Sequence, residues 1–405
     1  MKVLFAVPYI FNKQYPEFTR NGTGFGIFVN QIFECVGKEH EAYLVSQVLT
    51  KGHGNILPHT LMNVFCHLHV KDVIQGIRWA LRYKQSFGGR LRYFFSCINK
   101  GYLRYIIKKI NPDVVHIHGV GMRSENSIEV CRELKVKYVI TLHGLIGLSD
   151  SVKAAAWDKE HEKTVLLECE KNGVPVTVIS TGIKNRIEEH YLKGKSEMIS
   201  VVTNATCVEP KESVPYGNLR ELYHIPETGR IAVSVGNISF NKNQLQIVEA
   251  MDVLLKKGNS DLYVFLCGAE RDGGVVKARI KELGLEDRVI MLGFVSYEQM
   301  GDIFRQGETT VLASMEEGFG LSIIEGYVHG LPAVTFADLD AVPDLYHEKA
   351  MVLCKDRSTE ALADAMVQAF NTSWDAKWIQ AYSKQYSLEE MEKKYCAVYK
   401  IATKE

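Results

Sequence analysis

The chain has 405 residues, of which 46% are apolar and 24% are charged, so its composition is that of a globular protein and not of a disordered or fibrous one. This length suggests two or three domains. Lys and Arg number 48 together, as do Asp and Glu, so the overall charge points to no class of partner.

Cysteines and apolar runs suggest where the protein works. Nine cysteines are scattered between Cys35 and Cys396 without close pairs or metal-type spacing, which favours free thiols in a reducing compartment. Residues 1–7 are too short for a secretory signal and are typical of a first strand. No apolar run approaches the ~20 residues that a membrane span needs. We expect a cytoplasmic protein that can still lie peripherally on the inner face of a membrane.

In the first half of the chain, short apolar runs alternate with amphipathic stretches, which predicts a parallel sheet wrapped by helices. The predicted strands span residues 3–7, 42–45, 64–70, 114–117, 138–142 and 176–179, with helices over 25–36 and 157–171 among the stretches between them.

A glycine-rich segment follows the first strand. Gly22, Thr23 and Gly24 belong to a G-x-G-x-G run about fifteen residues beyond that strand. In a dinucleotide-binding fingerprint the glycines follow the strand directly, so this segment departs from it. Two interpretations stay open, a mobile loop that closes over a phosphate or acceptor, and an ordinary glycine-rich surface loop.

Residues 71–110 concentrate positive charge, with ten basic residues and a single acid, Asp72. Aromatic residues are interleaved with these charges, which suggests docking to an anionic membrane surface. Nucleic acid binding is a less expected reading of the same pattern. The structural alternative is a basic helix pair whose aromatic side chains face the core.

Histidines lie at two predicted strands. His143 directly follows the strand 138–142 and precedes a glycine, and strand ends are where this architecture places its sites. A buried, hydrogen-bonded histidine is the alternative. His116 and His118 alternate with apolar residues inside their strand, which favours structural roles.

The alternating pattern pauses near residue 201, and a polar stretch with two prolines follows over 209–218. We predict a first domain over 1–205, a second over 206–380 and a C-terminal helical segment over 381–405. The second half repeats the alternation, with strands over 231–235, 262–266, 289–291, 310–312, 333–336 and 351–353, and helices over 243–257, 274–283 and 388–402. The predicted fold class is α/β, with two doubly wound, Rossmann-like domains facing across a cleft.

Two segments of the second domain suggest an anion site. Lys242 lies at the predicted start of the helix after strand 231–235, where it can reach a neighbouring loop or simply be solvated. In the second segment, residues 314–332, Glu317 and Glu325 flank a glycine turn and a helix start. Glu325 would lie about 7 Å along that helix. Because a helix N-terminus attracts anions, this pattern suits a diphosphate with hydroxyl-rich groups at both ends.

These motifs carry a family resemblance. Glu317-Gly-Phe-Gly-Leu-x-x-x-Glu325, followed by Gly330-x-Pro332, resembles the signature of retaining family 4 glycosyltransferases with the GT-B fold. The resemblance extends over nearly the whole chain and includes the strand ending at His118, the Thr-Leu-His-Gly segment at His143, and the loop at 293–296.

The resemblance implies a retaining, metal-independent glycosyltransferase with a nucleotide-sugar donor and a glycan or lipid-linked acceptor, acting in cell-surface polysaccharide or glycolipid synthesis. Glu325 would bind ribose, Glu317 the transferred sugar and Lys242 the diphosphate, with His143 beside the reacting sugar. The implied remaining contacts are Gly318, Phe319, Gly320 and Leu321 around sugar and diphosphate, Asn237 beside the lysine, Phe294 and Val295 at the base, and Gly22, Thr23 and Gly24 near diphosphate and acceptor. It also implies a C-terminal helix that returns to the first domain.

Some positions depart from the family pattern. Asn237 stands where the family has an arginine, so one cation for the diphosphate is missing. Asp338 begins a segment that replaces a glycine pair; it has Asp-x-Asp spacing but lies after the glycine helix, so it predicts no metal–diphosphate site. The alternative function is a non-catalytic or epimerase-type nucleotide-sugar-binding protein of the same fold.

Overall fold

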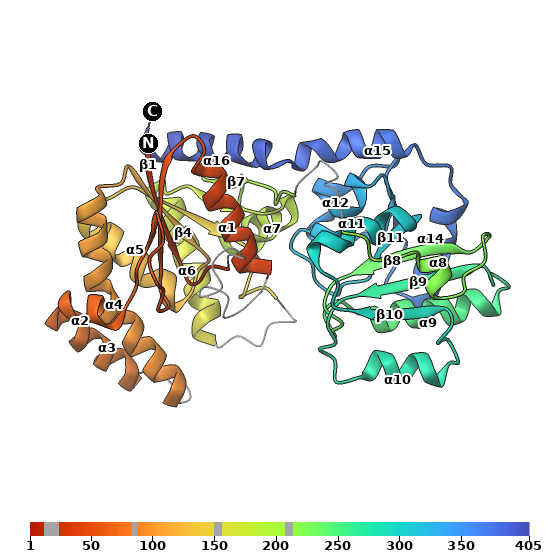
Figure 1. The fold of residues 1–405 in the computed structure, drawn as a ribbon. Helices are drawn as coiled ribbons and strands as arrows, with labels where there is room; N and C mark the ends of the chain where they lie inside the picture. The colour runs from red at the N-terminus through yellow and green to blue at the C-terminus, as the bar shows by residue number, and fades with distance from the viewer. Residues whose placement is uncertain (12–23, 83–86, 150–155, 207–213, 405) are drawn as a thin grey trace. The chain divides into compact units, whose positions relative to one another are not determined.

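The structure is a computed structural model that describes residues 1–11, 24–82, 87–149, 156–206 and 214–404 (Figure 1). The chain divides into two compact units. Unit 1 comprises Met1–Ile179, Ile183–Val202 and Leu388–Glu405, and unit 2 comprises Ser180–Gly182 and Thr203–Ser387.

Unit 1 is built on a parallel sheet of seven strands in the order β3-β2-β1-β4-β5-β6-β7. The strands are β1 Lys2–Val7, β2 Glu41–Ser46, β3 Ile56–Leu57, β4 Val114–His118, β5 Tyr138–Leu142, β6 Val176–Val178 and β7 Ile199–Val201. Its helices are α1 Gly24–Val36, α2 Leu61–Cys66, α3 Val70–Arg82, α4 Phe87–Ile110, α5 Met122–Leu134, α6 Ala156–Asn172, α7 Thr181–Ile187 with the π-helical turn Glu188–Leu192, and α16 Leu388–Thr403. The central strands are buried on both faces, which explains their near-continuous apolar runs.

Unit 2 has a parallel sheet of six strands in the order β10-β9-β8-β11-β12-β13. The strands are β8 Arg230–Val235, β9 Leu262–Cys267, β10 Val289–Gly293, β11 Thr309–Leu312, β12 Ala333–Phe336 and β13 Met351–Cys354. Its helices are α8 Leu219–Leu222, α9 Gln244–Lys256, α10 Val275–Glu282, α11 Tyr297–Gln306, α12 Leu321–Val328, α13 Val342–Leu345, α14 Thr359–Asn371, α15 Ala376–Ser383 and the short 3-10 turn Lys384–Tyr386.

The strand order reverses once in each sheet, between β1 and β4 in unit 1 and between β8 and β11 in unit 2. Loops leaving the two strands at such a point diverge to opposite faces of the sheet and leave a crevice, where ligands of this fold class bind. The loops after β8 and β11 carry Lys242 and Glu317, and the loop after β1 carries the glycine-rich segment.

The α/β fold class predicted from the sequence is confirmed, but one predicted strand is wrong. Residues 64–70 form the end of α2, a turn and the start of α3. Thr60 caps α2, since its hydroxyl accepts a hydrogen bond from the backbone N–H of Asn63 at 3.2 Å, and this signal was missed. The strand β3 was also missed, because two residues are too few to show a period, and β7 was missed because it falls where the alternating pattern pauses near residue 201.

The last helix, α16, belongs to unit 1, where it packs against α1, β4 and β5 (Figure 1). Its Tyr395 and Tyr399 are fully buried, and the thiol of Cys35 in α1 donates a hydrogen bond to the carbonyl oxygen of Leu388 at 3.0 Å. This helix therefore completes the core of unit 1 with residues from the far end of the chain.

Candidate functional site

The loop after β8 brings a lysine close to the strand end. Gly236 has φ 145°, and its backbone lies so near Gly268 that a side chain at either position would collide or be strained. The methylene groups of Lys242 pass over Gly236. Asn237 is exposed at the start of this loop. The sequence pattern had placed Lys242 at the start of the helix. In the structure, Lys242 lies in the loop, two residues before α9.

The loop after β11 leads into α12 through a left-handed glycine. Gly320 has φ 84°, which favours glycine at this position, and it is the N-cap of α12. No side chain in the described part of the chain caps this helix, so its first N–H groups remain available to a ligand. Leu321 is the first residue of α12, and Gly318 is half-buried in the loop before it.

Lys242 and Glu317 form an ion pair between these two loops. The exposed fractions of their side chains are 28% and 16%. Glu317 also accepts a hydrogen bond from the hydroxyl of the buried Ser314 at 3.3 Å. The structure thus brings together two of the predicted catalytic residues, which are 75 positions apart in the chain.

Two residues that sequence reasoning missed hold these loops in place. Asn241 bonds to the backbone of Met315 and Glu316 through three hydrogen bonds of 2.7–3.2 Å. Arg357 donates to the carbonyl oxygens of Ser314 at 2.7 Å and Met315 at 3.1 Å. No local pattern marks either residue, because their partners are far away in the chain.

Arg357 also explains a departure from the family pattern. Its guanidinium forms an ion pair with Asp338 at 2.8 Å and lies 4.4 Å from the centre of the Phe336 ring. Asp338 therefore anchors the arginine that supports the glycine loop. Arg357 is committed to these partners, so it does not stand in for the cation missing at Asn237.

Glu325 lies in α12 and is partly buried. Within the described residues its carboxylate makes neither a hydrogen bond nor an ion pair. Burial raises the pKa of Glu325 from 4.5 to about 7, against the opposing attraction of Lys242. A partly buried carboxylate without partners is costly, and the polar atoms of this one are left without hydrogen bonds from the described part of the chain.

The other predicted donor contacts differ in what they can offer. The side chain of Phe319 is buried and packs edge-on against Tyr386, with 6.0 Å between ring centres. Val295 is buried in the core of unit 2. Both can therefore contact a ligand only through their backbone. Phe294 is 79% exposed, so its ring is accessible.

Unit 1 places His143 at the end of a buried histidine cluster with His116 and His118. The Nδ1 of His118 lies 2.9 Å from the Nε2 of His143, and the rings of His116 and His118 stack with 4.2 Å between centres. His116 is bonded on both sides, to the Tyr399 hydroxyl at 2.8 Å and to the Thr141 hydroxyl at 2.6 Å. The structural roles predicted for His116 and His118 agree with this burial.

The cluster is neutral near pH 7. Burial lowers the pKa of His116 and of His143 to about 3, and it lowers the pKa of His118 well below 6.5. The Nε2 of His118 is buried without a hydrogen-bond partner among the described residues. Buried N–H groups are rarely left unpaired, so we assign the proton of His118 to Nδ1, from where it donates to Nε2 of His143. His143 then carries its own proton on Nδ1.

The predicted phosphate loop lies mostly outside the described residues. Gly22 and Thr23 lie outside the described residues, and Gly24 is the first residue of α1. Phe25 of α1 contacts the ring of His143 edge-on, with 4.8 Å between centres, so the helix that follows this loop begins beside His143.

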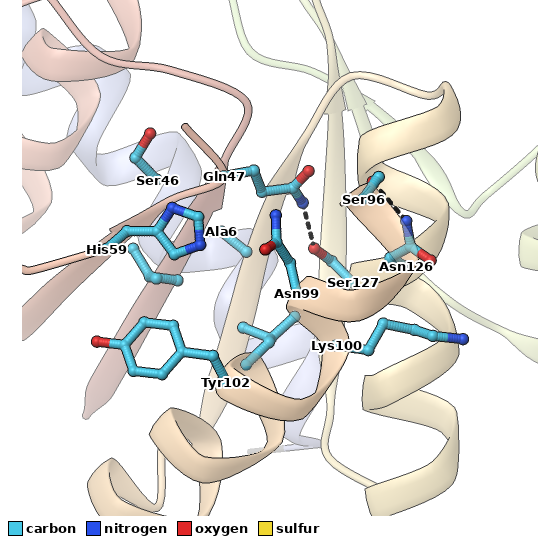
Figure 2. A pocket seen from close by; sticks show the side chains of 12 residues that line it. Ala6, Ser46, Gln47, His59, Ser96, Asn99, Lys100, Tyr102, Asn126 and Ser127 are labelled. Carbon is cyan, nitrogen blue, oxygen red and sulfur yellow. Dashed lines mark hydrogen bonds between the residues drawn. The ribbon is translucent and has the colours of Figure 1, made fainter. Parts of the chain in front are cut away.

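A second feature of unit 1 is a small cavity between the ends of β1 and β2 and the helices α4 and α5 (Figure 2). Gln47, His59 and Asn99 point toward it, and Gln47 donates a hydrogen bond to the Ser127 hydroxyl at 2.8 Å. Its volume of about 20 Å³ holds about one water molecule, so it is too small for a sugar ring.

The part of the chain that the structure describes shows neither a metal-binding cluster nor a membrane-spanning helix. No group of three or more His, Cys, Asp or Glu side chains there is arranged to hold a metal ion. No helix within the same ranges is long and apolar enough to cross a membrane.

Comparisons with known proteins agree with this geometry. Residues 217–385 match the family model described as glycosyl transferases group 1. The chain is 23% identical over 271 residues to N-acetyl-alpha-D-glucosaminyl L-malate synthase of Bacillus anthracis, a match that covers 65% of this chain and 66% of that protein, just under two thirds of its length.

Among solved structures, a glycosyltransferase from Rickettsia africae ESF-5 superposes with a TM-score of 0.71 at 20% identity, covering 99% of this chain and 98% of that one. Anabaena Alr3699/HepE in complex with UDP has a TM-score of 0.70 at 15% identity, covering 98% of this chain and 99% of that one. These likenesses confirm the predicted GT-B fold. Residues 217–385, in the second unit, are therefore similar to the group 1 glycosyltransferases.

Proposed function

We propose that the protein transfers a sugar from a UDP- or GDP-linked donor to a hydroxyl group of a glycan or lipid-linked acceptor, with retention at the anomeric carbon and without a metal. One observation carries this proposal: the Lys242–Glu317 pair stands at the uncapped N-terminus of α12, and the unpartnered carboxylate of Glu325 lies in the same helix.

The diphosphate is proposed to bind between Lys242 and the first N–H groups of α12. Departure of the leaving group builds negative charge on the diphosphate, and fixed donors and a cation stabilise that charge without reorganisation. The amides of Phe319, Gly320 and Leu321 are the donors at this position, since the Phe319 side chain is buried away from a ligand.

The two carboxylates are proposed to bind hydroxyl groups at either end of the donor. Glu325 would accept hydrogen bonds from the ribose, which supply the partners that its carboxylate lacks. Glu317, already oriented by Lys242 and Ser314, would accept from the transferred sugar. The backbone at Phe294 and Val295 would contact the base, and Gly318 would leave room beside the sugar.

His143 is proposed to lie beside the reacting sugar as a neutral hydrogen-bond donor. With Nε2 occupied by His118, its Nδ1–H can donate to a hydroxyl or phosphate oxygen. Gly22, Thr23 and Gly24 are proposed to contribute contacts to the diphosphate or the acceptor. The relative from Bacillus anthracis and the UDP complex of the Anabaena protein support UDP-N-acetylglucosamine as the first donor to test.

The decisive experiment is a turnover screen of UDP- and GDP-sugars with free and lipid-linked glycan acceptors, with and without EDTA. The proposal expects one donor to be consumed in the presence of an acceptor, and NMR to show that the product keeps the donor's anomeric configuration. The turnover rate with EDTA should be within about twofold of the rate without it, because a lysine and the helix dipole stabilise the charge that a metal ion would otherwise stabilise. Tight nucleotide binding without turnover would establish the non-catalytic alternative, and an epimerised sugar without acceptor would establish an epimerase.

A further inference from the structure

Unit 1 exposes apolar side chains over one group of helices. Nearly half of the large apolar side chains that are exposed in the described part of the chain lie within residues 61–95. Apart from Leu68, which lies between α2 and α3, these side chains belong to α2, α3 and the first half of α4, which we call the outer helix layer. Both α2 and α3 pack against α4 (Figure 1). An apolar surface of this kind on a globular unit marks a binding face.

The clearest part of this surface is on α3. Val70, Ile74, Ile77 and Leu81 follow one another at helical spacing and form one stripe, with exposed fractions of 74%, 44%, 48% and 75%. The packed side of the same helix carries Asp72 and Gly76, both buried. A side chain at Gly76 would collide with Phe94 of α4, so α3 already lies tightly against its neighbour. The stripe is therefore not the face of α3 that packs against α4 but a separate face that is exposed to solvent.

The neighbouring helices expose stripes of their own. In α4, Phe87, Leu91 and Phe95 are four residues apart and are exposed by 82%, 45% and 43%. In α2, Met62 and Phe65 are exposed by 71% and 57%. Not every aromatic residue of the segment takes part, because Tyr93 and Tyr102 are buried in the core as the structural alternative expected.

The charge of the outer helix layer indicates which kind of partner binds this face. Between residues 42 and 110 the only acidic residue is Asp72. Its carboxylate is buried and neutralised, since it accepts a hydrogen bond from Arg104 at 3.0 Å and lies 3.7 Å from the ammonium group of Lys100. The outer helix layer therefore offers no negative side chain of its own to a partner, while Arg78 is exposed beside the α3 stripe.

We propose that the outer helix layer docks on an anionic membrane surface, with α3 lying in the interface. Its apolar stripe would enter the boundary of the acyl chains, and Arg78 would contact the phosphate headgroups. An amphipathic helix with apolar residues on one face and cations beside them has the pattern of such interfacial helices. A second copy of the chain would bring a like-charged layer onto this one, which favours the membrane over self-association.

The proposal is independent of the reaction, so it is tested by binding alone. The full chain is sedimented with vesicles of phosphatidylcholine and with vesicles that also contain phosphatidylglycerol. The proposal expects binding to the anionic vesicles, weakened by salt, and little binding to the neutral ones. A wild-type chain that stays in the supernatant with both vesicles would overturn it.

Matched variants locate the surface. Ile77→Glu and Leu81→Glu should each weaken binding by about tenfold or more, since a charge replaces an inserted apolar side chain. Val275→Glu makes the same change at an exposed position of α10 and should have no effect. Arg78→Glu should weaken binding by about fivefold or more, whereas Lys277→Glu, also exposed, should not.

Two readouts keep the outcomes distinct. Donor turnover with a soluble acceptor should be the same in Ile77→Glu and in the wild-type chain. If Ile77→Glu loses turnover because it does not fold, vesicle binding by Arg78→Glu decides the proposal. Light scattering of the protein alone reports self-association. A dimer that Ile77→Glu abolishes, or equal vesicle binding by Ile77→Glu and Val275→Glu, would overturn the membrane proposal.

Discussion

The carboxyl-terminal edges of the two sheets have similar topology and different chemistry. In unit 2, the loops after β8 and β11 bring together Lys242 and Glu317, and α12 adds the unpartnered Glu325. In unit 1, β4 and β5 end in His118 and His143, which are bonded to each other and uncharged near pH 7. Both edges lie beside the point where the strand order reverses.

This difference in chemistry indicates which kind of ligand each sheet edge can bind. Lys242 and Glu317 of unit 2 form an ion pair, and Glu325 lacks hydrogen-bond partners among the described residues, which suits an anionic ligand rich in hydroxyl groups. The cluster of unit 1 is hydrogen-bonded internally except at Nε2 of His118 and at Nδ1 of His143, so it can offer a single N–H, that of His143, without introducing a charge. The predictions that follow test this contrast, from the largest expected effect to the smallest.

The largest effect should be acid destabilisation of unit 1. The pKa values of His116, His118 and His143 are lowered in the folded chain, while the unfolded chain titrates near 6.5. Their stabilisation is therefore complete above pH 6.5 and is lost as the pH falls toward about 3. For each fully buried histidine, the free energy of unfolding falls by about 1.4 kcal/mol per pH unit below 6.5. The fall is smaller for the partly exposed His143. Urea unfolding at a series of pH values measures this loss.

A variant separates the cluster from other acid-sensitive groups. His116→Asn should lower the stability at neutral pH and make its decline below pH 6.5 shallower. NMR signals of these histidines that titrate near pH 6.5 in the folded protein would contradict the neutral cluster.

Removing the cation of unit 2 should nearly abolish transfer. Lys242→Ala should lower turnover by about a hundredfold or more, because the developing charge on the diphosphate loses its fixed partner. Lys256→Ala, in the exposed ion pair with Asp252 on α9, is the matched control and should keep wild-type turnover. Wild-type kinetics for Lys242→Ala would remove this residue from the site.

Glu325→Gln should weaken binding of the nucleotide sugar by roughly tenfold, measured by calorimetry, because an amide accepts ribose hydroxyl groups less well than a carboxylate. Binding to the wild-type chain should also weaken as the pH falls below about 7, where Glu325 takes up a proton. Glu360→Gln, exposed on α14, is the control. An unchanged dissociation constant would exclude Glu325 from the donor site.

The same substitution should change stability in the opposite direction. Because the pKa of Glu325 is raised on folding, its contribution to stability is present below about pH 4.5 and is lost as the pH rises to about 7. Glu325→Gln should therefore be more stable than the wild-type chain at pH 8, by roughly 1–3 kcal/mol.

His118 tests the internal order of the unit 1 cluster. His118→Ala should lower turnover by about tenfold without changing donor affinity, because His143 loses the bond that holds its proton on Nδ1. His118→Asn keeps an N–H near the position of Nδ1 and should retain most of the activity. If both variants lose the same activity, His118 acts only through packing.

The smallest effect concerns the position that departs from the family pattern. Asn237 is exposed where β8 ends, so an arginine there needs no repacking. Asn237→Arg should tighten binding of the nucleoside diphosphate severalfold, since it adds a second cation next to Lys242. Unchanged affinity would mean that the diphosphate lies out of reach of this position.

Most long strands could be predicted from the sequence because they are buried on both faces and read as continuous apolar runs. The segment 64–70 could not, since only Val64 is buried while Phe65 and Val70 are exposed in two different helices, so its apolar residues carry no period that reports the core. The glycine turn before α12 was predictable for a local reason: Gly320 adopts a left-handed conformation that glycine favours.

Only the tertiary structure determines which residues contact the site residues. Asn241 and Arg357 hold the glycine loop, and Tyr399 reaches His116 from a helix 283 positions away. By itself, the sequence determined the alternation of strands and helices, the glycine turn and the identity of the charged groups, because these depend on local backbone preferences and periodicity. Folding alone decided that Lys242 meets Glu317, that Glu325 is left without a partner and that three histidines share one uncharged interior. Hydrogen bonds and burial depend on which strand ends become neighbours, and no local pattern specifies that.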